Sequence, residues 1–188
     1  MKNLKDYIIE EQSFLVNRKL NNRQDKYEYH PKTYDELKDI IIDLLKQGET
    51  DLNCIDVSNV TDMSGLFSWI NNYIIVKDID ISEWDVSNVT NMHSMFYGCT
   101  GFNSDLSNWN VSNVTDMGFM FYNCKEFNSD ISKWDVFNVI TMAVMFFGCK
   151  KFNSDLSKWD VSKVKTMKDT FTGCTTLKKN NKIPDWYK

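Results

Sequence analysis

Cysteines are the first residues in this sequence whose type and spacing could support chemistry. Cys54 stands alone, and the other four recur every 25 residues: Cys99, Cys124, Cys149 and Cys174. Thiolates bind zinc, but such sites are typically built from Cys-x-x-Cys pairs, and this chain has none. In stacked repeats, neighbouring thiols would lie on a line about 5 Å apart, which suits neither tetrahedral zinc nor a relaxed disulfide. We expect buried, small hydrophobic cysteines and no metal.

Two series of acidic residues keep the same repeat positions. One series comprises Asp51, Asp80, Asp105, Asp130 and Asp155; the other comprises Asp56, Asp85, Asp135 and Asp160, with Asn110 replacing the acid in one copy. Stacked carboxylates repel each other, so each needs a compensating interaction. We favour Asx turns, in which each carboxylate accepts a backbone N–H. The alternative is calcium held between repeats.

Residues for acid–base catalysis are scarce. His30 and His93 are the only histidines, and the repeat singles out no partners for a catalytic triad. The sequence also lacks a phosphate-binding glycine loop of either common type. We therefore expect a protein that is not an enzyme and that uses no cofactor.

These residues belong to a tandem repeat of 25 residues, which is marked most clearly by Trp84, Trp109, Trp134 and Trp159. Val89, Met92, Phe96 and Cys99 have helical spacing, which predicts a short helix in each repeat. Asn88 would cap its start, and Gly98 would end it in the left-handed conformation. The Asn-Ser-Asp-Leu-Ser-x-Trp segment predicts a short strand or an extended turn. Stacking of such repeats would make one continuous core.

The pattern divides the chain into four parts. Residues 1–30 form an extension with a polar tether, and residues 31–50 form a helix that covers the open end of the stack. This helix has a capping box at Thr33 and Glu36 and a terminating Gly48. About five repeats occupy residues 51–177, and residues 178–188 form a C-terminal cap.

The unit Trp-Asp-Val-Ser-Asn-Val-Thr-x-Met-x-x-Met-Phe-x-x-Cys-x-x-Phe-Asn-x-Asp-Leu-Ser resembles the BspA-like leucine-rich-repeat family over residues 31–177. That family includes bacterial surface proteins, mycoplasma lipoproteins and phage-encoded proteins. The resemblance implies an α/β solenoid, a right-handed leucine-rich-repeat-like coil. It also implies a binding role, often adhesion, without catalytic residues.

Charge is distributed unevenly along the chain. Residues 51–149 carry 3 Lys+Arg and 12 Asp+Glu, a balance of −9, whereas residues 150–188 carry 10 Lys and 4 Asp, a balance of +6. The basic end predicts contact with an acidic protein or nucleic acid, and the alternative is a solvated face. The lysines proposed for such contacts are Lys163, Lys165, Lys168, Lys178, Lys179 and Lys182.

Apolar residues at outward-facing helix positions of the middle repeats predict an exposed patch. Its members are Phe119, Tyr122, Phe137, Ile140, Val144 and Phe147. We expect this patch to bind a protein partner or a second copy of the chain. The alternative is that a long loop or the first 30 residues cover it.

The sequence contains no signal peptide and no apolar stretch of membrane-spanning length, so we expect a cytoplasmic protein without a membrane partner. The leading hypothesis is an intracellular protein-binding repeat module. A narrower version is a phage-encoded inhibitor of a host defence complex. The alternatives are a structural or virion-associated repeat protein and a surface adhesin or lipoprotein.

Overall fold

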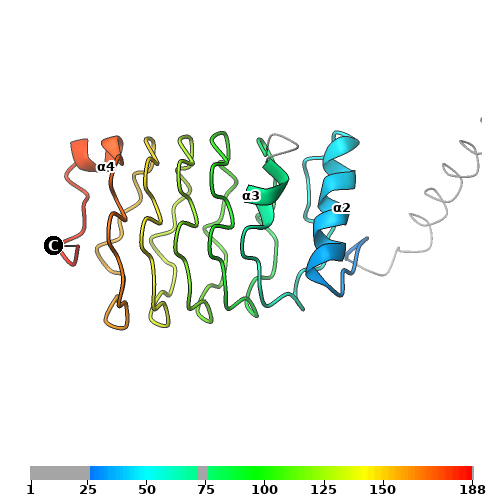
Figure 1. The fold of residues 1–188 in the computed structure, drawn as a ribbon, viewed down its shortest axis with the longest axis horizontal. Helices are drawn as coiled ribbons and strands as arrows, with labels where there is room; N and C mark the ends of the chain where they lie inside the picture. The colour runs from blue at the N-terminus through cyan, green and yellow to red at the C-terminus, as the bar shows by residue number, and fades with distance from the viewer. Residues whose placement is uncertain (1–25, 72–75, 188) are drawn as a thin grey trace, which may run out of the picture.

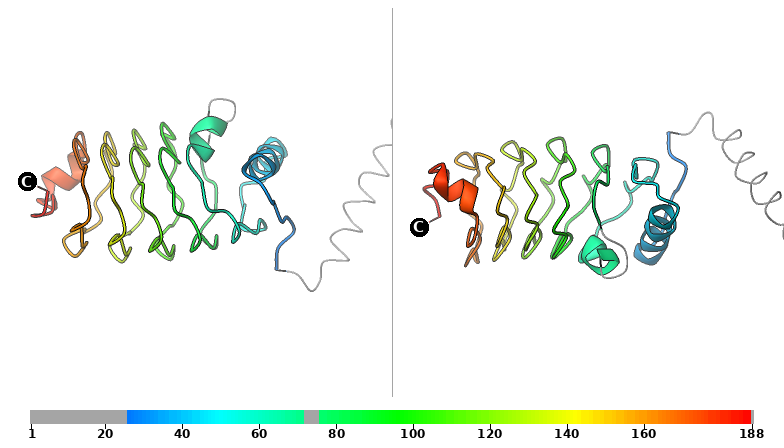
Figure 2. Two further views of the ribbon diagram at one scale, coloured as in Figure 1. Left: turned by 60° about the horizontal axis from the view of Figure 1, so that its bottom comes forward. Right: turned by 90° about the horizontal axis from the view of Figure 1, so that it is seen from above.

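The computed structural model of the protein describes residues 26–71 and 76–187. The chain winds into successive coils that stack along the long axis, with α2 at one end and the C-terminus at the other (Figures 1 and 2). The helices of the described residues are α2 (Tyr34–Lys46), α3 (Leu66–Asn71) and α4 (Thr175–Lys179). The coils are joined by single parallel bridges, for example from Asp116 to Thr141 and on to Thr166. Most of the predicted N-terminal extension, residues 1–25, lies outside the described residues.

The helix expected near residue 34 is confirmed as α2. Thr33 Oγ1 accepts the N–H of Glu36 at 3.2 Å, and the Glu36 carboxylate accepts the N–H of Lys32 at 2.7 Å, so both residues satisfy donors at the helix start. Gly48, with φ +84°, follows its C-terminal end. The apolar stripe of α2 buries Leu37, Ile41 and Leu44.

The short helix that we expected in every repeat is absent from the coils between α3 and α4. Ser94, Phe119 and Val144 occupy the same position in successive coils and have φ values of 55°, 57° and 61°. A left-handed residue cannot continue a right-handed helix. Instead, the N–H of Ser94 donates to the carbonyl of Gly118 in the next coil at 2.9 Å, and the N–H of Phe119 donates to Ala143 at 3.0 Å. Hydrogen bonds between coils therefore replace those within a helix.

The asparagine expected to cap each helix has a different role. The side chains of Asn88, Asn113 and Asn138 each donate through Nδ2 to a backbone carbonyl of the preceding coil, at 2.7–2.8 Å. The predicted N-caps are thus wrong, because no helix follows them. These amides hold neighbouring coils together.

Aromatic side chains fill the core in columns parallel to the long axis. One column has ring centroids 5.2–5.7 Å apart and contains Phe67, Phe96, Phe121, Phe146 and Phe171. A second column contains Phe102, Phe127 and Phe152. All but Phe171 are fully buried, and Phe171 is 5% exposed. The buried apolar area is the principal stabilising contribution of the stack.

Polar atoms of the core side chains bond to the preceding coil. The indole Nε1 of Trp109 donates to the carbonyl of Ile81 at 3.1 Å, and that of Trp134 donates to Leu106 at 3.0 Å. Trp186 continues this series by donating to Leu156 at 2.9 Å. Each coil is therefore fastened to its predecessor by directional bonds as well as by packing.

Ser129 provides a test of the side-chain hydrogen bonds between coils. Its Oγ accepts the buried N–H of Leu106 at 2.8 Å and donates to Asp105 at 3.2 Å. Ser129→Ala leaves the Leu106 N–H without an acceptor, so we expect a loss of about 1–3 kcal/mol in the free energy of unfolding. Urea denaturation measures it. Asn108→Ala, at an exposed position, is the control and should change stability by less than about 0.5 kcal/mol; equal effects of the two variants would contradict this account.

Candidate protein-interaction surface

The cysteine series is buried and protonated. Cys124 Sγ donates to the carbonyl of Phe96 at 3.0 Å, and Cys149 Sγ donates to that of Phe121 at 2.9 Å. Burial raises the pKa of Cys99 and Cys174 to about 12, and it raises the pKa of Cys124 well above its ordinary value. These thiols are buried in the core and donate hydrogen bonds to the preceding coil, which is a structural role. In residues 26–71 and 76–187, no three His, Cys, Asp or Glu side chains are grouped to hold a metal ion.

The aspartate series form the expected Asx turns. Asp105 Oδ1 accepts the N–H of Ser107 at 2.9 Å, and Asp130 Oδ1 accepts the N–H of Ser132 at 3.1 Å. In the other series, Asn110 accepts the N–H of Ser112 at 3.2 Å in the same way. The backbone N–H of Ser107, with the Ser107 hydroxyl, lowers the pKa of Asp105. These bonds are the interaction that offsets repulsion between stacked carboxylates.

A polar groove of about 440 Å³ runs beside these turns, between two neighbouring coils. Its lining includes Asn103, Asn128 and Ser129. The N–H of Asn128 donates to Asn103 Oδ1 at 2.7 Å, and Ser129 bonds to both Leu106 and Asp105. The polar atoms of the groove thus connect coils to each other.

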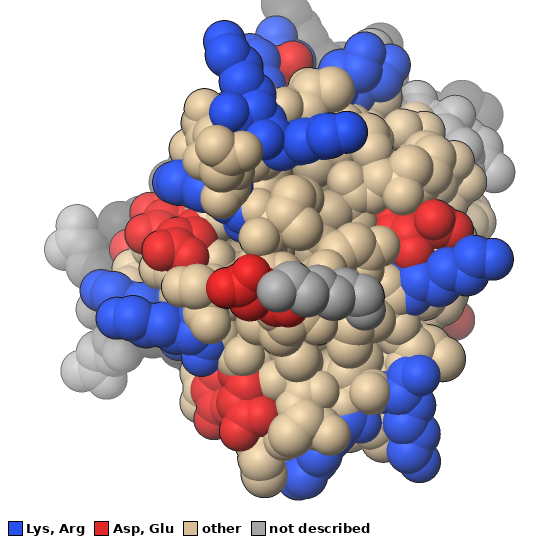
Figure 3. Space-filling model, turned by 90° about the vertical axis from the view of Figure 1, so that its left-hand side faces the viewer, with Lys and Arg blue, Asp and Glu red and all other residues tan. Residues whose placement is uncertain are grey.

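The predicted lysine cluster lies around the rim of the C-terminal end of the stack rather than in one patch. Figure 3 shows this end with lysines at its periphery and acidic side chains between them. Lys163 Nζ donates to Asn138 Oδ1 at 2.8 Å, and Lys182 Nζ donates to the carbonyl of Asn153 at 3.0 Å. Lys165 and Lys168 are exposed on the last coil, and Lys178 and Lys179 end α4.

Three aromatic side chains form a stacked row on the outer face of the coils, which we call the aromatic ladder: Tyr97, Tyr122 and Phe147. The Tyr97 and Tyr122 ring centroids are 4.5 Å apart and nearly parallel, and those of Tyr122 and Phe147 are 5.1 Å apart. Phe119 lies beside the ladder, 6.2 Å from Tyr122. Val144 occupies the position of Phe119 in the next coil. Tyr97 is 41% exposed, and the others are partly exposed.

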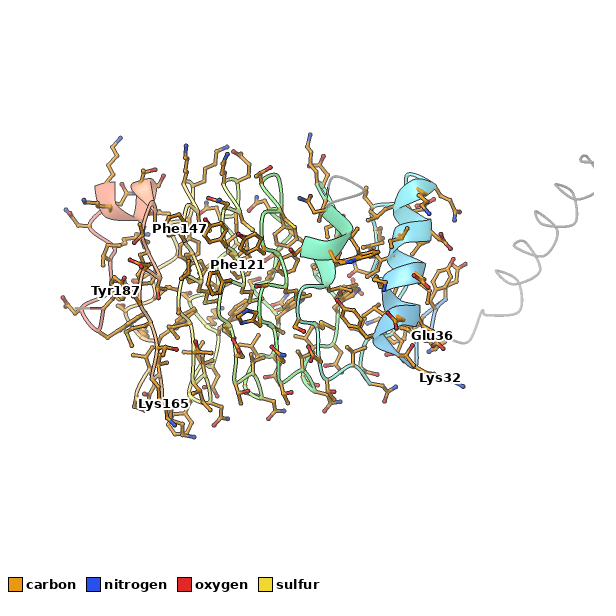
Figure 4. The ribbon with its side chains drawn as sticks, viewed as in Figure 1. Lys32, Glu36, Phe121, Phe147, Lys165 and Tyr187 are labelled. Atoms are coloured by element: carbon orange, nitrogen blue, oxygen red, sulfur yellow. The ribbon has the colours of Figure 1, made fainter. Side chains whose placement is uncertain are left out.

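The structure divides the predicted apolar patch into two parts. Phe137 and Ile140 are each 42% exposed but lie away from the aromatic ladder. The carbonyl of Ile140 accepts the N–H of Lys165, and Figure 4 places Lys165 at the lower edge of the stack, with Phe147 toward the upper edge. Lys163 Nζ lies 3.8 Å from the centroid of the Phe137 ring. The expectation of one patch rested on a helical projection, and it is wrong because these coils contain no helix.

Two residues beside the aromatic ladder were not expected there. Tyr97 extends the ladder by one coil, and the signal was available because aromatic residues recur at positions 97, 122 and 147. The His93 ring centroid lies 5.6 Å from that of Phe119, and its Nδ1 is 3.2 Å from the Asp116 carboxylate. This contact places a polar pair at the margin of the apolar surface.

Comparison with known proteins gives a family. Residues 38–134 and 107–187 match the family described as "Mycoplasma protein of unknown function, DUF285". The chain belongs to the DUF285 family. No curated protein and no solved structure matches it. Within the described part of this DUF285 protein, no helix has both the length and the apolar character needed to cross a bilayer.

Two residues at the aromatic ladder are held in a conformation that their side chains disfavour. Phe119 and Val144 have positive φ, whereas this position of the DUF285 repeat holds Gly65, Ser94 or Asp169 in other coils. A bulky or β-branched residue in this region costs about 1–3 kcal/mol. The two coils that bear this cost are those that carry Tyr122 and Phe147 of the ladder.

The Asx turns predict how the stability of this DUF285 protein depends on pH. The pKa values of Asp105 and Asp130 are lower in the folded state than the ordinary value, chiefly through backbone N–H bonds, and return to about 3.9 on unfolding. The stabilisation is therefore complete above the unfolded pKa and is lost as pH falls through the lower folded pKa. We expect the melting temperature, followed by circular dichroism, to fall below about pH 4. The double variant Asp105→Asn, Asp130→Asn, which keeps both acceptors, should show a shallower fall; an equally steep fall would contradict this assignment.

The strained positions predict an unusual response to substitution. We expect Phe119→Asn and Val144→Asn to leave the melting temperature equal or raise it, because relief of about 1–2 kcal/mol of strain offsets the lost apolar contact. Phe121→Ala, in the buried column, should instead cost about 3–5 kcal/mol. Thermal unfolding monitored by tryptophan fluorescence compares the three variants. A loss in Val144→Asn as large as that in Phe121→Ala would contradict the proposed strain.

Proposed function

We propose that this DUF285 protein is a non-enzymatic, protein-binding repeat module whose partner contacts the aromatic ladder together with Phe119 and Val144. The observation that carries the proposal is a row of partly exposed, mutually stacked rings. Two bulky apolar residues flank the row at positions where other coils hold glycine or polar residues.

Rigid aromatic side chains suit this role. The rings of Tyr97, Tyr122 and Phe147 already stack on each other, so binding would immobilise few additional side-chain rotations. Aromatic residues are enriched at the buried centres of protein interfaces. Phe137 and Ile140 have comparable exposure, but they contact Lys163 and Lys165 rather than stacked rings. The ladder is therefore the better candidate for the centre of an interface.

We also propose that the stack is a right-handed solenoid of the BspA-like, leucine-rich-repeat type. The Trp, Met, Phe and Cys columns and the repeat length support it. The expected helix of each repeat is replaced by stacked turns in the middle coils. Repeat folds of this kind present long surfaces for recognition. A cytoplasmic location, a phage-encoded inhibitor of host defence, and the virion-associated or adhesin alternatives stay predictions.

The proposal is tested with the triple variant Tyr97→Ser, Tyr122→Ser, Phe147→Ser. We expect this variant to lose the wild-type partner from pull-downs in cells of the encoding organism by about tenfold or more, because the contact area at the interface centre is removed. Quantitative mass spectrometry measures recovery, and sedimentation velocity measures self-association.

Phe137→Ser is the matched control, since it removes an equally exposed ring from the other edge of the stack. It should bind as wild type does. Unchanged partner recovery and unchanged sedimentation of the triple variant, with its fold intact by circular dichroism, would exclude the aromatic ladder as the interface.

A further inference from the structure

Peptide groups form continuous hydrogen-bonded columns along the stack. The N–H of Met92 donates to the carbonyl of Asp116, and the N–H of Met117 donates to that of Thr141, both at 2.9 Å. The Asp116 carbonyl and the Met117 N–H belong to one peptide group, so successive bonds join into one chain. This column continues through Met142 to the Thr166 carbonyl.

Three further columns run in the same direction. Each column contains one N–H donor from each coil. The donors of the first column are Ser94, Phe119 and Val144. Those of the second are Phe96, Phe121 and Phe146, and those of the third are Gly98, Asn123 and Gly148. All these N–H groups point toward the C-terminal end. Two other series run the opposite way, through the N–H groups of Thr115, Ile140 and Lys165 and through those of Glu126, Lys151 and Thr176. The four columns outnumber them, so their aligned peptide dipoles leave net positive charge at the C-terminal end, as at the N-terminus of a helix. Successive N–H groups of residues that alternate between right-handed and left-handed φ/ψ conformations also form concave sites that attract anionic oxygens.

The last member of each column offers a free donor. Within the described part of the chain, no acceptor lies opposite the N–H of Met167, Asp169, Phe171 or Gly173. Phe171 is covered by Trp186 and Tyr187, whose ring centroids lie 5.8 and 5.0 Å from its own. Met167 and Asp169 are not covered in this way. We call residues 164–169 the C-terminal edge.

The C-terminal edge is also partly apolar. Val164 and Met167 are partly exposed, whereas their equivalents one coil earlier, Val139 and Met142, are fully buried. The edge therefore combines free backbone donors with the exposed rim of the core. Such a combination is the usual template for the addition of an extended segment.

Charge indicates the chemistry of that segment. Residues 150–187 carry nine lysines and four aspartates, a balance of +5. Lys165 and Lys168 are exposed on the edge itself. We propose that the C-terminal edge binds an extended acidic segment of a partner protein, which supplies backbone carbonyls to the N–H groups of Met167 and Asp169 and carboxylates to these lysines.

Two other occupants fit less well. A second copy would have to offer its opposite end, but α2 covers that end, and the Tyr34 hydroxyl already donates to the Ser64 carbonyl at 3.0 Å. Nucleic acid would favour arginine and free aromatic faces. Residues 26–187 contain no arginine, and the edge exposes valine and methionine. A protein segment matches both the donors and the apolar rim.

The probe is a synthetic peptide of residues 112–123 with three glutamates added at its N-terminus. In the folded chain these residues supply carbonyls to the preceding coil. We expect the Met167 and Asp169 amide resonances of ¹⁵N-labelled protein to shift on titration with the peptide. A scrambled peptide of identical composition should bind about tenfold more weakly.

Variants separate backbone pairing from charge. Met167→Pro removes a donor that has no partner, so it should preserve the melting temperature and weaken peptide binding about tenfold. Met142→Pro, which breaks a bond between coils, should unfold the chain. The pair Lys165→Glu, Lys168→Glu should weaken binding about tenfold. Lys133→Glu, Lys150→Glu, with the same change in net charge, should leave it within about twofold.

Several results would overturn the proposal. They are no amide shift at about 1 mM peptide, equal binding of the scrambled peptide, tighter binding of a single-stranded oligonucleotide, or self-association that Met167→Pro abolishes. The triple variant of the aromatic ladder should retain peptide binding. Failure at either surface can therefore be distinguished from failure at the other. If Met167→Pro does not fold, the lysine double variant and the titration of the wild-type protein still test the proposal.

Discussion

Backbone hydrogen bonding between coils is the constraint on which the rest of this structure depends. A coil made mostly of turns satisfies only part of its own N–H and C=O groups, and buried backbone groups must be paired. The remaining groups form hydrogen bonds with the neighbouring coil. For example, the N–H of Ser94 donates to the carbonyl of Gly118, and that of Phe119 donates to the carbonyl of Ala143. Packing alone would allow coils to slide or rotate against one another. The peptide columns fix their register, and the aromatic columns follow from that register.

The side chains extend the same principle. The indoles of the Trp series, the amides of the Asn series and thiols such as that of Cys124 bond to an adjacent coil, so polar side-chain atoms recur at these positions of the repeat. Ser129, for example, satisfies a backbone N–H and a carboxylate at once. Positions outside this network are free to vary. The side chains of the aromatic ladder stack on each other rather than on the core, so we expect substitutions there to leave the assembly of the coils intact.

Much of this arrangement is predictable from sequence, because it depends on residue type and period. Helix α2, the Asx turns and the stacked Trp, Phe and Cys columns fall in this class. The short helix of each repeat was wrongly predicted for a specific reason. Met92, Met95, Phe96 and Cys99 are buried at spacings that a helix also produces. Stacked turns and a helix thus share one hydrophobic pattern, and only the hydrogen-bond partners differ.

The candidate site was less predictable than the core. Phe119 and Val144 adopt a backbone conformation that their residue types disfavour, so no local preference reveals it. Without that conformation, the helical projection placed Ile140 on the same face as Phe119 and Phe147. Tyr97 was not predicted, although aromatic residues recur at positions 97, 122 and 147.

The uniform contact between coils has an evolutionary consequence. Each interior repeat forms the same side-chain hydrogen bonds with the repeat before it and accepts the same bonds from the repeat after it. The Trp and Asn series are examples. Duplication or loss of a whole unit would therefore recreate a native junction rather than a mismatched one. Unequal recombination within such a gene could lengthen or shorten the stack while preserving its fold. Members of this family can thus change the extent of their surface in single genetic steps.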